Sequence, residues 1–109
     1  MVVTVAKHVK SASSYEDGDV IFRLILPLVQ AGEKVVVDFS GITSVPSAFV
    51  NAAFVRLLEH VTFNQVRNTL SFTQSTRQIN QLIRSRFEFV SKHGTGQVPA
   101  PADGDDEGV

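Results

Sequence analysis

The sequence predicts a small α/β domain with a short, mainly parallel or mixed sheet and about three helices. Short β-branched runs alternate with longer segments of helical periodicity, in the order strand, helix, strand, helix, strand, helix. Crossovers through helices favour parallel strands and right-handed connections. Residues 91–109 are rich in glycine, proline and acids, so we expect residues 1–90 to form the folded domain and the rest to be a disordered tail.

The first strand is expected at residues 2–9 (VVTVAKHV), because β-branched side chains dominate that run. In the polar segment that follows, Ser14 and Asp17 have the spacing of a helix-start box. Apolar residues then recur with the period of one helix face, at Ile21, Leu24, Ile25, Leu28 and Val29. Pro27 interrupts this pattern, and we expect a kink or an early end of the helix near Leu26.

The clearest strand is expected at residues 34–39 (KVVVDF), where three consecutive valines predict burial on both faces, as in a central parallel strand. The loop SGITSVP then leads to a helix from about Ser47 to His60. That helix is apolar almost all round, and small residues at positions 48, 52 and 53 permit close approach. Two explanations stay open: another helix of the same chain covers it, or it is a surface for a partner or for self-association.

The last two elements are a third strand near residues 67–73 and a helix that begins at Ser75. The segment VTFNQV before the strand is expected to be a connection. Ser75 and Gln78 have the spacing of a capping box. The apolar stripe of the last helix consists of Ile79, Leu82, Ile83, Phe87 and Val90.

Composition restricts the function classes. The net charge of −1 gives no global field that would recruit nucleic acid or an anionic membrane. The absence of cysteine excludes disulfides, thiol nucleophiles and cysteine-bound zinc. The N-terminus lacks the pattern of a signal peptide, and no apolar run reaches the roughly 18 residues of a membrane span. A cytoplasmic protein is therefore the expectation.

The candidate functional residues lie at the end of the central strand and directly after it. Asp38 stands at the carboxyl end of that strand, where open α/β sheets bind ligands, although a lone Asp there more often caps the following loop. Ser40, Ser44 and Ser47 surround the helix start, where Ser44 is a candidate cap and an exposed hydroxyl is a candidate phosphate acceptor. No second acid, nucleophile elbow or glycine-rich phosphate loop is near, so we expect neither an enzyme nor a cofactor.

Two other groups of residues carry weaker signals. His8, His60 and His93 lack metal-ligand spacing, so no metal site is expected. Arginines of the last helix have the charge to contact phosphate backbones, but without interleaved aromatic residues or a positive net charge we interpret them as a solvated face; they are Arg77, Arg84 and Arg86. No nucleic-acid partner is expected.

The stretch VVVDFSGITSVPSAFV resembles the signature of STAS domains, in which a strand ending in Asp-(Leu/Phe)-Ser leads to serines at a helix start. It is still more similar to the STAS-like group of unknown function (DUF4325 type). The matching positions are Val35–Phe39, Gly41, Ile42, Ser47 and Phe49. The resemblance covers roughly residues 14–90, and outside this motif it follows the order of the elements.

The resemblance implies a function by protein–protein contact. STAS proteins such as anti-sigma factor antagonists bind a histidine-kinase-like ATPase, and phosphorylation of a serine at this helix start ends the interaction. This chain has Pro46, Ala48 and Phe49 where the family pattern has Asp, the second Ser and Gly, so Ser47 is the one serine left as a candidate acceptor. The expected contact residues are Asp38, Ser40, Ser44, Ser47, Ala48 and Phe49. The alternative is a homodimeric assembly module without a phosphorylation switch.

Overall fold

The computed structural model describes residues 1–93, and it confirms the α/β class. A three-stranded parallel sheet has the order β1-β2-β3. In chain order the elements are β1 (Val2–Thr4), the 3-10 helix η1 (Val5–Lys7), α1 (Tyr15–Gln30), β2 (Val35–Asp38), α2 (Ser47–Ala53), the 3-10 helix η2 (Val55–Glu59), α3 (Phe63–Thr69), β3 (Leu70–Thr73) and α4 (Arg77–His93). Residues 91–93, where the tail was expected to begin, belong to α4. The rest of the expected tail, residues 94–109, lies outside the described residues.

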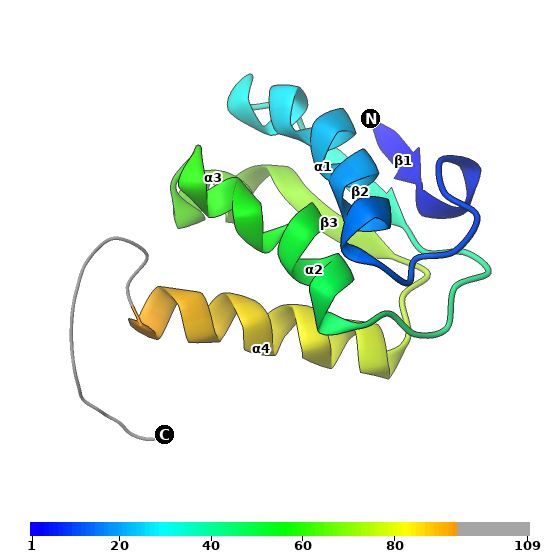
Figure 1. Ribbon diagram of the computed structural model, residues 1–109. Helices are drawn as coiled ribbons and strands as arrows, with labels where there is room; N and C mark the ends of the chain where they lie inside the picture. Colours follow the sequence, from blue (N-terminus) through cyan, green and yellow to red (C-terminus); the bar gives the residue numbers. More distant parts are fainter. Residues whose placement is uncertain (94–109) are drawn as a thin grey trace.

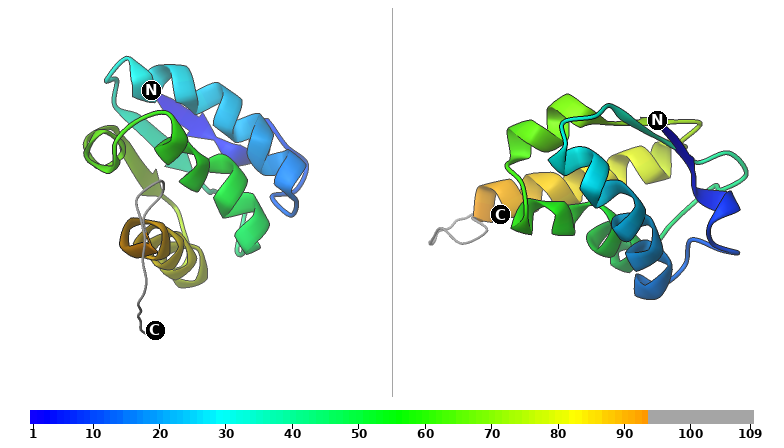
Figure 2. Two further views of the ribbon diagram at one scale, coloured as in Figure 1. Left: turned by 60° about the vertical axis from the view of Figure 1, so that its left-hand side comes forward. Right: turned by 90° about the horizontal axis from the view of Figure 1, so that it is seen from above.

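The long helices cover one face of the sheet (Figure 1, Figure 2). Right-handed crossovers between strands in sequential order place every connecting helix on the same side. The burial of β2 reflects this arrangement, because Val35 and Val37 are fully buried whereas Val36 and Asp38 are half-buried. The prediction that β2 is the central strand is confirmed, and the prediction that both of its faces are buried is wrong.

The packing of α1 against α2 explains why the helix after the loop is so apolar. Gly18 of α1 lies directly on α2, where a Cβ atom would be 2.6 Å from the Phe49 carbonyl oxygen and 2.8 Å from the Ala52 Cβ. Ala52 and Ala53 are fully buried. Of the two explanations left open, cover by another helix of the same chain is therefore the one that the structure shows.

Several element boundaries differ from the expectation. The first strand ends at Thr4 and continues as η1. Helix α1 continues through Pro27 to Gln30, because a proline one turn from the helix end removes only one donor there. The helix expected over residues 47–60 divides into α2 and η2 at Phe54. The segment expected as a connection contains α3, which makes four α-helices.

The predicted start of α1 is confirmed. The Asp17 amide donates to the Ser14 hydroxyl at 3.1 Å, and the Asp17 carboxylate accepts from the Ser13 amide at 3.1 Å. At α4 the capping hydroxyl belongs to Thr76, which accepts from the Ile79 amide at 3.3 Å, and not to Ser75. Gln78, the second residue of the expected box, has another role, described below.

Four phenylalanine rings pack together on the covered side of the sheet, three of them fully buried and one, that of Phe72, half-buried. Phe54 contacts three other rings edge to face, at centroid distances of 6.2, 6.1 and 5.1 Å. Those rings belong to Phe39 after β2, Phe49 of α2 and Phe72 of β3. Because edge-to-face pairs at this separation are favourable, the cluster holds the end of β2, helix α2 and strand β3 in one arrangement.

Candidate functional site

Asp38 lies at the carboxyl end of the sheet, in register with Thr4 of β1 and Thr73 of β3. One carboxylate oxygen accepts from the Ser40 hydroxyl at 2.6 Å and from the Ser40 amide at 2.9 Å, and the other accepts from the Thr4 hydroxyl at 3.3 Å. These hydrogen bonds, above all the one from the Ser40 hydroxyl, lower the pKa of Asp38. Its carboxylate therefore holds the loop in place, as a lone Asp at this position commonly does.

The loop after β2 turns sharply at Gly41. The Ile42 amide donates to the Phe39 carbonyl at 2.9 Å, and Gly41 has a φ of 82°. This is the backbone that the third position of a type II turn requires, and glycine adopts it without strain. The turn leaves Ser40 and Gly41 exposed.

Two side chains at the start of α4, the capping residue Thr76 and Gln78 in the first turn, fix the second half of the loop. The Thr76 hydroxyl donates to the Thr43 carbonyl at 2.6 Å. The Gln78 amide pairs with both backbone groups of Val45, accepting from its N–H and donating to its carbonyl, each at 3.1 Å. Val45 is buried, so these bonds satisfy backbone groups that have little access to water. The loop is therefore held at both ends.

The start of α2 differs from the expectation for Ser44. Pro46 occupies the N-cap position, and because its side chain has no hydrogen-bonding group, the helix has no side-chain capping bond. Val45, between Ser44 and the cap, is held by Gln78, so the expectation that Ser44 caps the helix is wrong. Ser47 and Ala48 are the first two helical residues, and both are exposed.

Phe49 does not belong to the accessible surface. Its side chain is 0% exposed and lies against Phe54 in the core. Helical rotation places the two residues before it outside and Phe49 with Val50 inside. The expectation that Phe49 contributes an exposed contact is therefore wrong.

The exposed part of this region is a neutral surface that we call the docking face. Its residues are small and uncharged, and they come from the loop and the first turn of α2: Ser40, Thr43, Ser44, Pro46, Ser47 and Ala48. Asp38 is half-buried at its base. Within residues 1–93, no group of three histidine, aspartate or glutamate side chains is placed to hold a metal ion.

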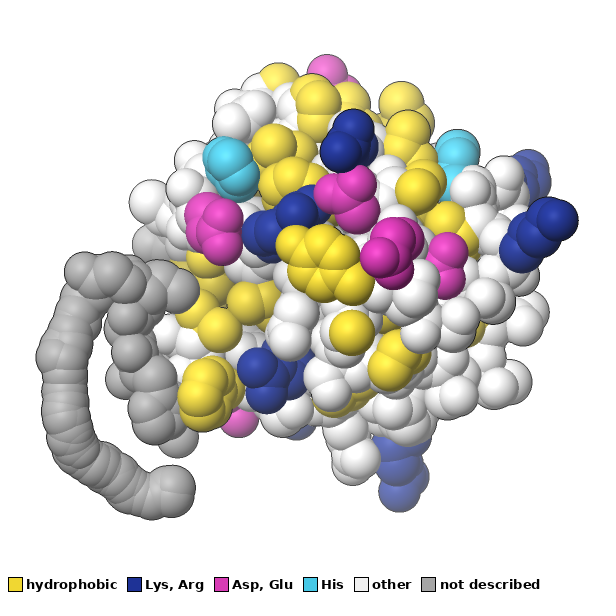
Figure 3. All heavy atoms as spheres, in the orientation of Figure 1, with side chains coloured by type: hydrophobic (Ala, Val, Ile, Leu, Met, Phe, Trp, Pro, Cys, Tyr) yellow, Lys and Arg dark blue, Asp and Glu magenta, His cyan; other side chains and the backbone are white. Residues whose placement is uncertain are grey.

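Two of the polar residues that interrupt the apolar segment, Asn51 and Arg56, have partners inside the chain. Asn51 accepts from Arg86 of α4 at 3.1 Å. Arg56 donates to Asp19 and to the Tyr15 hydroxyl of α1, and its guanidinium lies 3.9 Å from the centre of the Phe22 ring. These contacts join helices, and across the face drawn in Figure 3 basic and acidic side chains lie close to one another.

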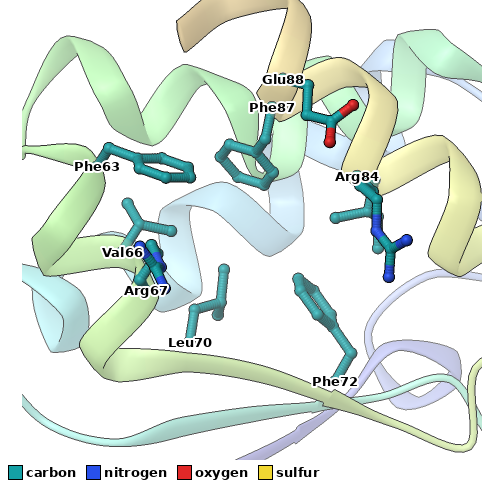
Figure 4. A pocket seen from close by; sticks show the side chains of 9 residues that line it. Phe63, Val66, Arg67, Leu70, Phe72, Arg84, Phe87 and Glu88 are labelled. Carbon is teal, nitrogen blue, oxygen red and sulfur yellow. The ribbon is translucent and has the colours of Figure 1, made fainter.

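A second feature, an apolar cavity of about 450 Å³, lies between α3, β3 and α4 (Figure 4). Aromatic and aliphatic side chains line it, with arginines and a glutamate among the lining residues: Phe63, Val66, Arg67, Leu70, Phe72, Ile83, Arg84, Phe87 and Glu88. Phe63 and Phe87 face each other at 6.0 Å between ring centres. Sequence reasoning missed this cavity because it treated α3 as a connection.

The pKa of Asp38 gives a measurable signature of the loop. We expect its carboxyl to titrate below the ordinary value of 3.8, because hydrogen bonds from Ser40 favour the charged form. The contribution of this carboxylate to loop order is then present above pH 3.8 and is lost as the pH falls through the lowered value. The carboxyl carbon shift of Asp38, followed by NMR, measures the midpoint.

Two variants separate the contacts of Asp38. Ser40→Ala should raise the midpoint toward 3.8, and Thr4→Val should raise it less, because the Thr4 hydroxyl makes the longer bond. A midpoint that Ser40→Ala leaves unchanged would show that the hydroxyl does not hold the carboxylate in solution.

Comparisons with known proteins agree with the resemblance of the loop region. Residues 17–80, more than half of the chain, match the family described as a STAS-like domain of unknown function (DUF4325). No curated protein and no solved structure matches the chain. Within residues 1–93, none of the helices has the length and apolar character needed to cross a membrane. The matched region includes the β2–loop–α2 motif. This chain therefore belongs to the family of STAS-like domains of unknown function.

Proposed function

We propose that this domain is a non-enzymatic regulator that binds a signalling partner through the docking face, and that the partner is a histidine-kinase-like (GHKL-type) ATPase. The observation that carries the proposal is a loop held at both ends that presents Ser47 and Ala48, exposed, at the start of α2. A loop with a fixed shape loses less conformational entropy when a partner binds. Small residues also allow the backbone of a partner to approach closely.

Ser47 is the proposed point of regulation. The docking face carries no charged side chain, so a phosphate on the Ser47 hydroxyl would add about two negative charges and three strong acceptors to a neutral surface. Removing that dianion from water on complex formation is costly unless the partner supplies cations. Phosphorylation therefore opposes binding, as the resemblance to anti-sigma factor antagonists implies.

The alternative of a homodimeric assembly module depended on an uncovered apolar helix. Helix α1 covers α2 within the chain, and Phe49, Ala52 and Ala53 are fully buried. The helix therefore supplies no reason for a homodimer, and we do not propose one.

Replacing Ser47 with Asp should weaken binding of the ATPase by about tenfold or more, equivalent to at least about 1.4 kcal/mol. The matched control is Ser85→Asp, a charge added at another exposed helical serine away from the docking face. Isothermal titration calorimetry against the histidine-kinase-like ATPase of the source organism gives both affinities. Equal losses for the two variants, or no loss for Ser47→Asp, would place the interface elsewhere.

Site-directed photocrosslinking tests the identity of the partner. A photoreactive residue at Ala48 should give an adduct with a histidine-kinase-like ATPase in the native cell, and one at Gln81, exposed on α4, should not. With that ATPase and nucleotide, mass spectrometry should find phosphate on Ser47 alone. An adduct of equal yield from Gln81, or phosphate only on Ser14 or Ser75, would contradict the site.

A further inference from the structure

The apolar cavity between α3, β3 and α4 has the size of a small-molecule site. Its volume of about 450 Å³ lies within the range of roughly 300–1,000 Å³ that is typical of ligand pockets. Figure 4 shows the rings of Phe63 and Phe87 on one side of the space and the side chains of Leu70 and Phe72 on the other. Leu70 and Phe87 are buried, whereas Phe63 is 38% exposed. The cavity therefore has an apolar floor and reaches the surface at Phe63.

The chemistry of the lining restricts the body of a ligand. Among the described residues that line the cavity, the polar side chains are those of two arginines and one glutamate, and none is a serine, threonine, asparagine or glutamine. A sugar or a nucleoside would leave most of its hydroxyl and amide groups without side-chain partners, which is costly in a site shielded from water. An apolar body removes both its own surface and that of the lining from water. The lining therefore favours an apolar body.

Two arginines give this cavity a cationic rim. Arg67 comes from α3 and Arg84 from α4, and both are exposed. The Arg67 guanidinium lies 5.8 Å from the centre of the Phe63 ring, so this charge stands beside the exposed end of the cavity. Within residues 1–93, neither arginine forms an ion pair with an acidic side chain. Glu88 is the one acid among the described lining residues, so two positive charges against one negative charge leave a net charge of +1.

We propose that this cavity binds a small monoanion with an apolar body, of the class of fatty acids and aromatic carboxylates. The body lies between the rings of Phe63 and Phe87 and the side chains of β3, and the carboxylate stays at the mouth, where Arg67 or Arg84 donates to it. A guanidinium presents its donors in a fork that matches the two oxygens of a carboxylate. A single negative charge is balanced by the net charge of the lining. This inference does not depend on the proposed docking face.

Titration of the full chain with octanoate tests the site. With isotope-labelled methyl groups, octanoate should shift the NMR signals of Leu70 and Ile83, which line the cavity, and the shifts should saturate at one molecule per chain. The methyl signals of Val3 are the internal control, because β1 forms the other edge of the sheet. Unchanged signals of Leu70 and Ile83 at millimolar octanoate, or equal shifts at Val3, would overturn the proposal.

Arginine variants and the neutral analogue 1-octanol test the anionic group. Arg67→Gln combined with Arg84→Gln should lower the affinity for octanoate by about tenfold and change that for 1-octanol by less than about twofold, because the substitutions remove charge-assisted hydrogen bonds. The matched control is Arg77→Gln, at an exposed position of α4 outside the lining, which should alter neither affinity. Equal losses for the two compounds, or an unchanged affinity for octanoate in the double variant, would refute the carboxylate contact.

Phe63→Ala tests the position of the apolar body. Because the substitution removes one wall of the cavity at a partly exposed ring, it should weaken octanoate and 1-octanol to a similar degree. A loss confined to octanoate would show that the body lies elsewhere. If the methyl signals of Leu70 and Ile83 instead move with protein concentration in the absence of either compound, a second copy of the chain fills the cavity, and the small-molecule site is wrong.

Discussion

Phe49→Asp is expected to unfold the domain and not merely to weaken partner binding. The Phe49 side chain is fully buried, with its ring edge to face with that of Phe54 at 6.1 Å. Truncation of a buried phenylalanine costs about 3–5 kcal/mol, and an uncompensated buried carboxylate costs several more. Since small domains have a total stability of about 5–15 kcal/mol, we expect most molecules of this variant to be unfolded at 25 °C.

The neighbouring residue supplies the control for this expectation. Ala48 is exposed one position earlier in the same helix turn, so Ala48→Asp should change the free energy of unfolding by only about 0.5 kcal/mol. Urea titration followed by circular dichroism measures the free energy of unfolding of both variants. A cooperative transition of Phe49→Asp near that of the unsubstituted protein would show that α2 does not bury this ring in solution.

The orientation of α2 was available from the sequence, although its cover was not. Residues 49, 50, 53, 54 and 57 recur with helical spacing and are all buried, whereas Ser47 and Ala48 lie outside. In the sequence this spacing is obscured by the small apolar residues between these positions, which make the run almost continuous. What the run could not reveal is that Gly18, about thirty residues earlier, allows α1 to lie directly against α2.

Helix α3 illustrates a local signal that was overlooked. Thr62 accepts from the Gln65 amide at 3.1 Å, which is the same Thr/Ser-x-x-Gln spacing that was interpreted as a helix start at residue 75. The cavity could not be predicted from the sequence, because α3, β3 and α4 meet there only after the chain has folded. The role of Gln78 in holding Val45 likewise joins residues 33 positions apart.

Adding a side chain at Gly18 should destabilise the domain by forcing α1 away from α2. In an isolated helix Gly18→Ala would gain about 1 kcal/mol of helix propensity. Here the new methyl group would be 2.6 Å from the Phe49 carbonyl oxygen, a backbone atom that cannot turn aside. Overpacking of this kind costs about 1–3 kcal/mol and at times more, so the clash exceeds the propensity gain.

Gly18→Val carries the test further, because its branched side chain adds two methyl groups at the same contact and gains less helix propensity than alanine. We expect Gly18→Ala to lower the free energy of unfolding slightly and Gly18→Val to lower it by about 3 kcal/mol, as measured by urea titration. Ala52→Gly, added to Gly18→Ala, relieves the 2.8 Å contact but not the one with the backbone, so the recovery should be partial. If Gly18→Ala instead stabilises the protein by the full propensity difference, α1 and α2 are not in backbone contact and the buried position of Phe49 loses its explanation.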